Sequence, residues 1–427
     1  MLSRRTFLYS LPALSLATLP TEAAYRLTRA DDEFLENLCR RSFQYFLEQS
    51  DAHTGLTLDR ARTDGAMHDE THRNTASIAA TGFGLTAQCI AAERGWAGRE
   101  EVRERTLNCL RFLNERAPRE HGWFYHWMDW RIGERVWKSE ISSIDTALLM
   151  GGVLTARQYF ANDKEIPKLA AQLYHAIDFQ WMLNGHARLL SMGWHPESGF
   201  IKNRWDTYSE HPLLYLLAIG SPTHGVTPRA WWSWRRSWIE YKRQRYLGSN
   251  TPLFTHQFSH AFVDFRHRRE NRLPYVDYFQ NSVTATRVHR QFCLDLAKEF
   301  PGYSENIWGI TASDSAKGYV AWGGPPRHKS IDGSVVPSAA GGSLMFAPDI
   351  CLPALKAMKE KFGEKIYGKY GFADAFHPTQ AWVNPDVIGI DLGITLLSAE
   401  NLRSGNVWRW FMRNPELTRA LALAGLR

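Results

Sequence analysis

Cysteine is scarce in this sequence. Five cysteines, Cys39, Cys89, Cys109, Cys293 and Cys351, are scattered over 427 residues, and no two of them form a Cys-x-x-Cys motif. The odd number leaves at least one thiol unpaired, and the spacing indicates neither a zinc site nor a disulfide framework. Since Cys39, Cys89 and Cys109 lie in apolar helical patterns, we expect them to be buried thiols.

Motifs that define several common chemistries are also missing. The sequence contains no His-Glu-x-x-His, no phosphate-binding loop and no paired-glycine dinucleotide fingerprint. It has no Gly-x-Ser-x-Gly elbow either, although a Ser/His/Asp hydrolase built without that elbow stays open. We therefore expect neither a metal nor an organic cofactor.

No apolar run approaches the roughly 20 residues of a membrane-spanning helix. The N-terminus instead resembles an export signal, with Arg4 and Arg5 in a twin-arginine pattern, an apolar stretch to about Leu19, and small residues at Thr21 and Ala23. This predicts a signal peptide over residues 1–23, a mature domain over 24–427, and a periplasmic or secreted protein. The alternative is an ordinary basic start followed by a first helix.

Aromatic residues, in contrast, are abundant. The 17 Trp, 16 Tyr and 22 Phe make up 13% of the chain. Large rings fill hydrophobic cores, and they also stack on flat ligands such as sugars. The composition alone leaves both uses open.

Helical periodicity dominates the chain, and strand signals are confined to residues 200–202 and 318–321. With no fixed-period repeat and no long linker, the pattern favours one all-α domain, and the helix count fits an (α/α)6 barrel of six inner and six outer helices. Residues 78–87 and 145–154, rich in apolar and small side chains, are candidate inner helices. The expected helices are 32–47, 74–94, 99–116, 140–161, 164–183, 209–219, 227–244, 254–266, 277–299, 342–361, 391–402 and 414–424.

Residues 205–222 carry the most informative pattern. They place Glu210 between aromatic residues and the start of a strongly apolar helix. Because desolvation opposes the charged form of a carboxylate, this setting predicts a raised pKa and a general acid. The alternative is that Glu210 caps the helix.

Three further acids stand at the beginnings of apolar helices: Glu140, Asp145 and Asp391. Asp145 has no Lys or Arg in the four residues after it. Each of these acids either lines a pocket or caps its helix, since carboxylates are also favourable at helix N-termini.

Two other groups suggest ligand binding. His260 and Asp264 are four residues apart and are expected on one helix face, as a substrate-binding or structural pair. The loop around Trp308 and Asp314 combines a ring with short polar side chains, which suits a sugar subsite.

Residues 231–245 combine Trp231, Trp234 and Trp238 with several arginines. The spacing predicts an amphipathic outer helix with a packed apolar face and solvated cations. Binding of nucleic acid by this segment is the weaker alternative.

Six motifs in order resemble the bacterial glycoamylase-like family, which includes the endo-β-1,2-glucanases. The resemblance runs from residues 54–60 to 411–416. Its motifs are residues 77–80, 144–148, 208–222, 256–260, 306–314 and 386–391.

This resemblance implies a glucoamylase-like (α/α)6 barrel that hydrolyses β-1,2-glucan with inversion. Glu210 matches the family's general-acid candidate, and Asp145 and Asp391 match carboxylates that line its cleft. Inversion requires about 6.5–9.5 Å between the two carboxyl groups, to leave room for a water. The expected substrate-binding residues are Glu140, Tyr208, His260, Asp264, Trp308, Asp314, Trp205 and Trp127.

The sequence departs from the family pattern at residues 392–394, which read Leu-Gly-Ile where Gln-Gly-Pro is usual, and at residues 281–285, where basic residues are common. A glucan transglycosylase or phosphorolytic enzyme, and a non-catalytic β-glucan-binding protein, therefore stay as alternatives. The expected partner is an oligo- or polysaccharide, with no nucleic acid and no membrane after signal cleavage, and the chain is expected to be a monomer.

Overall fold

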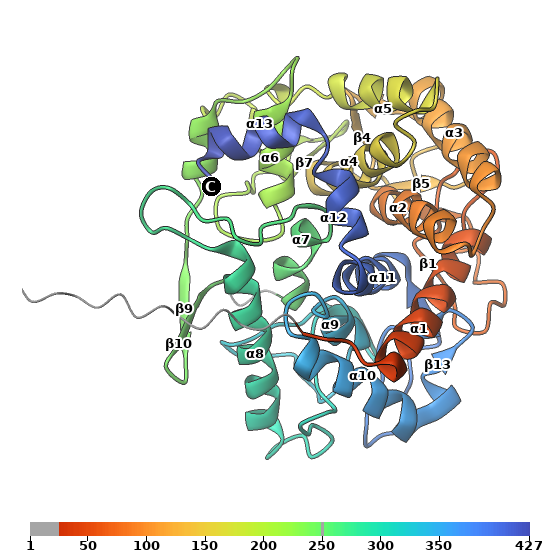
Figure 1. The fold of residues 1–427 in the computed structure, drawn as a ribbon, viewed down its shortest axis with the longest axis vertical. Coiled ribbons are helices and arrows are strands. Elements are labelled where there is room, and N and C mark those ends of the chain that lie inside the picture. Colours follow the sequence, from red (N-terminus) through yellow and green to blue (C-terminus); the bar gives the residue numbers. More distant parts are fainter. Residues whose placement is uncertain (1–24, 249–251) are drawn as a thin grey trace, which may run out of the picture.

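A computed structural model describes residues 25–248 and 252–427 (Figure 1). The predicted signal peptide lies outside these residues. The described part is mostly helical, as predicted. Its α-helices are α1 (Arg29–Glu48), α2 (Ile78–Arg94), α3 (Arg99–Glu115), α4 (Ser143–Tyr159), α5 (Ile166–His175), α6 (Pro212–Gly220), α7 (Phe258–Phe262), α8 (Tyr278–Leu296), α9 (Pro337–Gly341), α10 (Pro348–Phe362), α11 (Gly389–Arg403), α12 (Asn406–Phe411) and α13 (Pro415–Ala424).

The helix ends follow local sequence rules. Thr28 and Asp31 form a capping box at the start of α1, and the hydroxyls of Ser77 and Ser142 accept N–H groups in the first turns of α2 and α4. Gly95 ends α2 in the left-handed conformation, which a residue without a side chain adopts at little cost.

Six helices are buried on most sides: α2, α4, α6, α7, α9 and α11. Going round this set, α2 packs on α4, α4 on α6, α6 on α7, α7 on α11, and α11 on both α2 and α9. In Figure 1, α1, α3, α5, α8 and α10 lie further out. One extensive hydrophobic core joins most of these elements. All five cysteines are buried and free, which confirms the expectation for Cys39, Cys89 and Cys109.

Glycines allow α2 and α4 to pack backbone against backbone. A Cβ added to Gly152 would lie 2.0 Å from the carbonyl oxygen of Gly82, and one added to Gly82 would lie 2.3 Å from that of Leu148. Neither neighbour is a flexible side-chain tip, so the helices would have to separate. This is why small residues recur in the two segments predicted to be inner helices.

Substitution Gly152→Ala is expected to lower the free energy of unfolding by about 2–4 kcal/mol, as overpacking against backbone does. Chemical denaturation monitored by circular dichroism measures this. In the control Gly98→Ala, the new methyl would lie 4.0 Å from its nearest neighbour, and the expected cost is that of a poorer helix cap, about 1 kcal/mol. Equal effects of the two substitutions would contradict the close-packing explanation.

Short strands lead into three of the buried helices. Strands β2, β6 and β15 end where α2, α4 and α11 begin, and they pair with β5, β7 and β1, respectively. The strands are β1 (Arg60–Arg62), β2 (Thr75–Ser77), β3 (Arg119–Glu120), β4 (Trp123–Phe124), β5 (Trp127–Asp129), β6 (Ile141–Ser142), β7 (Gly193–His195), β8 (Gly199–Phe200), β9 (Trp238–Tyr241), β10 (Gln244–Leu247), β11 (Ala312–Ser315), β12 (Gly318–Ala321), β13 (Tyr367–Gly368), β14 (Gly371–Phe372) and β15 (Asp386–Ile388). Each pairing is antiparallel.

The helix predicted over residues 227–244 is wrong. The segment forms a short 3-10 helix (Pro228–Trp232) and the antiparallel hairpin β9–β10, which projects at the left of Figure 1. Lys242 and Arg243 turn the hairpin with positive φ. Trp231 and Trp234 are buried as expected, but Trp238 is 39% exposed, so the three rings do not share one packed helix face.

Three other predicted helices are shorter than expected. The helix predicted over residues 164–183 ends at His175, and only a 3-10 turn (Trp181–Leu183) follows. Residues 254–266 contain only a 3-10 turn (Leu253–His256) and α7, and residues 342–361 begin as loop before α10. Of the helices in the described part of the chain, none is long and apolar enough to cross a membrane.

Candidate active site

The three predicted catalytic carboxylates lie at the same ends of neighbouring buried helices. Asp145 is in the first turn of α4, Asp391 is in the first turn of α11, and Glu210 comes two residues before α6. The charge of Asp145 acts on Glu210 and on His126, and that of Asp59 acts on both His126 and Asp391, so these three helix starts belong to one end of the buried set.

Glu210 does not cap its helix. The N-cap of α6 is His211, and no side chain caps it. The carboxylate of Glu210 accepts a hydrogen bond from Ser209, and its backbone carbonyl accepts one from the hydroxyl of Ser259 at 2.5 Å. Burial, reinforced by the charge of Asp145, raises the pKa of Glu210. A carboxyl group whose pKa is raised in this way is suited to donate a proton to a leaving oxygen.

Asp145 belongs to a hydrogen-bonded acid–histidine group with Glu140 and His126. Its carboxylate accepts a hydrogen bond from Ser142 at 2.5 Å and lies 3.6 Å from Nε2 of His126. Nδ1 of His126 lies 3.0 Å from Glu140. Burial opposes the charge on His126, but Asp145 and Glu140 outweigh it and raise the pKa of the imidazole. Asp145 therefore both supports the start of α4 and shares a charge network.

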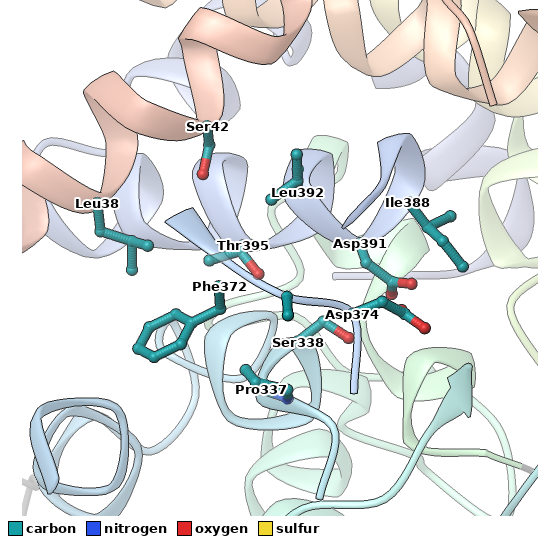
Figure 2. A pocket seen from close by; sticks show the side chains of 11 residues that line it. Leu38, Ser42, Pro337, Ser338, Phe372, Asp374, Ile388, Asp391, Leu392 and Thr395 are labelled. Atoms are coloured by element: carbon teal, nitrogen blue, oxygen red, sulfur yellow. The ribbon is translucent and has the colours of Figure 1, made fainter. Parts of the chain in front are cut away.

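Asp391 faces a second carboxylate, Asp374, which the sequence interpretation missed. Figure 2 shows the two side chains approaching each other beside a small cavity between α1, α9 and α11. They are 8% and 4% exposed. Burial raises the pKa of Asp391 to about 6, although a hydrogen bond from Asp374 lowers it.

A polar network holds Asp374 from the other side. The backbone N–H of Asp314 and the side-chain amide of Asn384 both donate to its Oδ2, at 2.9 and 3.0 Å. The amide of Asn384 also reaches Asp314, which pairs with Arg60 at 2.8 Å. Asp314 therefore lies at the site, as predicted, but its contacts are with this network and not with Trp308.

Asp59 is electrostatically coupled both to the group that contains His126 and to the Asp374–Asp391 pair. Its charge contributes to the raised pKa of both His126 and Asp391. Asp145, in turn, acts on His126 and on Glu210. The acids thus form one connected cluster in which the charge state of each depends on its neighbours.

Aromatic side chains border this cluster. Trp127 stacks on His126 with ring centroids 3.5 Å apart and meets the partly exposed Trp137 edge-on. Tyr319, on β12, is 59% exposed. Burial, followed in size by the charges of Asp391 and Asp374, raises the pKa of its hydroxyl, so Tyr319 is electrostatically linked to the acid pair.

Several predicted substrate-binding residues are instead structural. Trp308 is fully buried, so no sugar can stack on it. Trp205 is buried and donates to Ser143, and Tyr208 is buried with its ring stacked on Tyr278.

The His260–Asp264 pair is also wrong, because α7 ends at Phe262. His260 is buried among Phe265, Phe279 and Phe346, where burial lowers its pKa to about 3. Asp264 pairs with Arg266 beyond the C-terminal end of the helix, away from the helix starts that carry the acids.

Two groups of side chains could hold a metal ion: His126, Glu140 and Asp145, and a second group of His68, Asp69 and His72. Within each group the ligand atoms lie within 4.8 Å of one another. In the second, Nδ1 of His68 already accepts the N–H of Asp69, and its Nε2 lies 2.9 Å from Asp386. Hydrogen bonds and ion pairs inside the protein account for both arrangements.

Asp374, Asp59, His126 and Tyr319 are the residues that sequence reasoning did not single out. Asp374 could have been found, because residues 372–376 surround it with Phe and Ala, the same signal that identified Asp391. The others carry no such signal. They reach the site through loops and hairpins.

Comparisons with known proteins indicate the family of this chain. The family described as "Putative glucoamylase" matches residues 202–415. The endo-β-1,2-glucanase structure from Chitinophaga pinensis is 30% identical, with a TM-score of 0.86 over 94% of this chain and 99% of that one. The β-1,2-glucanase structure from Parabacteroides distasonis is 27% identical, with a TM-score of 0.84 over 94% of this chain and 60% of that one.

A curated relative from Parabacteroides distasonis, an exo β-1,2-glucooligosaccharide sophorohydrolase acting at the non-reducing end, is 28% identical over 94% of this chain. This chain spans 59% of that relative's length.

This similarity places the chain among the glycoside hydrolases, and its carboxylate cluster is of the kind that glycoside hydrolysis uses. More particularly, the chain belongs to the glucoamylase-like family that contains the bacterial β-1,2-glucanases, which confirms the resemblance seen in the sequence.

Proposed function

We propose that this protein hydrolyses β-1,2-linked glucans, with Glu210 as proton donor and Asp391 as the base that activates water. The observation that carries the proposal is a pair of buried carboxyl groups with raised pKa at helix starts on one end of the buried set. Burial and the charge of Asp145 raise the pKa of Glu210, and at Asp391 the hydrogen bond from Asp374 offsets part of the rise that burial causes. One acid and one base on a single cleft are what glycoside hydrolysis requires.

The β-1,2 linkage is supported by the relatives, which are named as an endo-β-1,2-glucanase and as a β-1,2-glucooligosaccharide sophorohydrolase. The test is incubation of the purified protein with linear β-1,2-glucan beside β-1,3-, β-1,4- and α-1,4-glucans, with products separated by chromatography. Products from the β-1,2 polymer alone are expected. No product from any polymer would favour a β-glucan-binding protein, and oligosaccharides longer than the substrate would favour a transglycosylase.

The same experiment separates the two modes of cleavage in the family. A mixed ladder of oligosaccharides would indicate endo action, and accumulation of the disaccharide sophorose alone would indicate exo action. Nuclear magnetic resonance of the first products reports stereochemistry: an inverting enzyme acting on a β-linkage releases the α-anomer first.

The proposal includes an (α/α)6 barrel. The six buried helices α2, α4, α6, α7, α9 and α11 would form its inner ring, since each contacts a neighbour in the set. The acids would then lie at the open end of the ring, next to the hairpins and loops. Export through a twin-arginine signal is also part of the proposal, and it predicts that replacing Arg4 and Arg5 by Lys keeps the protein in the cytoplasm.

Tyr319 is expected to contribute to substrate binding. Substitution Tyr319→Ala should raise KM about fivefold, because an aromatic contact contributes about 1 kcal/mol beyond its buried area. Tyr319→Phe should retain most of the affinity if the ring, rather than the hydroxyl, makes the contact. Steady-state kinetics on β-1,2-glucooligosaccharides measure this, and unchanged KM in both variants would contradict it.

A further inference from the structure

The Asp374–Asp391 pair presents a specific electrostatic problem. Two ionised carboxylates buried side by side repel each other strongly, and the guanidinium of Arg60, whose charge also reaches Asp374, is already paired with Asp59 and Asp314. One proton shared by the pair solves this problem. The question is which of the two residues holds it.

Hydrogen bonding assigns the proton to Asp374. Its Oδ2 accepts two N–H groups, from the backbone of Asp314 and from Asn384. Its Oδ1 is buried, and among the described residues no conventional donor reaches it. Since Oδ2 already accepts two hydrogen bonds and Oδ1 has no donor in the described part of the chain, the proton of the carboxyl group belongs on Oδ1, where the O–H can point at Asp391.

The surroundings keep the proton there. The cavity next to the pair has a volume of about 20 Å³, room for one water, and its polar lining on α1 and α9 is the hydroxyls of Ser42 and Ser338. The titratable groups that face the pair are Asp59 and Arg60 at the start of β1, and Asp314 and Tyr319 on β11 and β12. Burial is the largest cause that raises the pKa of Asp374 well above its usual range, and the charge of Asp391 is the next.

We propose that Asp374 is a positioning residue: it stays protonated at Oδ1 and donates a hydrogen bond to Asp391, which is thereby held ionised and oriented as the base. This proposal rests on the proposed function, because it gives Asp391 the role of base. It adds a residue that neither the sequence pattern nor the names of the relatives assign.

The decisive experiment compares two substitutions at one position. Asp374→Asn preserves the arrangement, since its amide oxygen can accept the two N–H groups while its NH₂ donates to Asp391. We expect kcat within about threefold of the native value. Asp374→Ala removes the donor, and we expect kcat to fall about 10- to 100-fold, with the acidic limb of the kcat/KM profile moved to higher pH. If Asp374 were ionised, Asp374→Asn would lose as much activity as Asp374→Ala and would move the acidic limb to lower pH.

An infrared measurement decides the point without any activity. The difference spectrum between the native protein and Asp374→Asn at pH 7 should contain the carbonyl stretch of one protonated carboxylic acid. Its absence would overturn the proposal even if β-1,2-glucan is hydrolysed. Its presence in a protein that hydrolyses no glucan would support the shared proton while contradicting the proposed function.

Discussion

Substitution Glu210→Gln is expected to lower kcat on β-1,2-glucan about 10³-fold while leaving KM within a few-fold, because a general acid contributes about 10²–10⁴ to rate. Glutamine keeps the shape of the side chain and its contact with Ser209, but it has no proton to transfer to the leaving oxygen. Initial rates of reducing-sugar release measure kcat, and binding of the inactive variant to oligosaccharide measures affinity separately.

The matched control is Asp206→Asn, four residues earlier in the same loop. Asp206 has a half-exposed side chain paired with the exposed Arg235, so its loss should leave kcat unchanged. Glu210→Gln activity within a few-fold of the native value would remove Glu210 from the mechanism. Full activity on an activated aryl glycoside, which needs little protonation to leave, would in contrast strengthen its role as acid.

Substitution Asp391→Asn is expected to have an effect of similar size, about 10³-fold in kcat, since it removes the base that activates water. It should also change the pH profile. With the pKa of Asp391 raised to about 6, native kcat/KM should fall as pH decreases through that value, because the base becomes protonated. The raised pKa of Glu210 sets the opposite limb, where activity is lost as pH rises and the acid ionises.

Residual activity of Asp391→Asn should therefore lack the acidic limb. Asp264→Asn is the control, because Asp264 lies beyond the C-terminal end of α7 and is paired with Arg266. An unchanged acidic limb in Asp391→Asn would show that another carboxylate of the cluster, such as Asp145, is the base.

Much of this fold was predictable because its helices are long and periodic. Residues 99–116 and 391–402 match α3 and α11 closely, as do residues 277–299 and α8. The helix predicted over residues 227–244 was wrong because tryptophans three and four residues apart satisfy a helical period. Trp231 and Trp234 are instead buried from a 3-10 turn and the loop after it, and Trp238 is exposed on β9. Periodicity cannot separate these cases when the segment is short.

The site was predictable only in part, and for a physical reason. Glu210, Asp145 and Asp391 carry a local signal, a charge at the start of an apolar helix. His126 and Asp59 do not, since their roles come from antiparallel pairing of distant segments such as β1 with β15 and β2 with β5. Trp308 was misplaced because a sequence cannot tell whether a ring beside polar residues faces a cleft or the core.

The buried acid pair also has an evolutionary consequence. Groups of this kind are costly to bury, and well-packed apolar replacements often stabilise a protein, so selection for stability alone would discard both carboxylates. Asp374 and Asp391 persist at 4% and 8% exposure in this chain. Any descendant released from the need to turn over glucan is therefore expected to change first at these two positions, and to become more heat-resistant as it does.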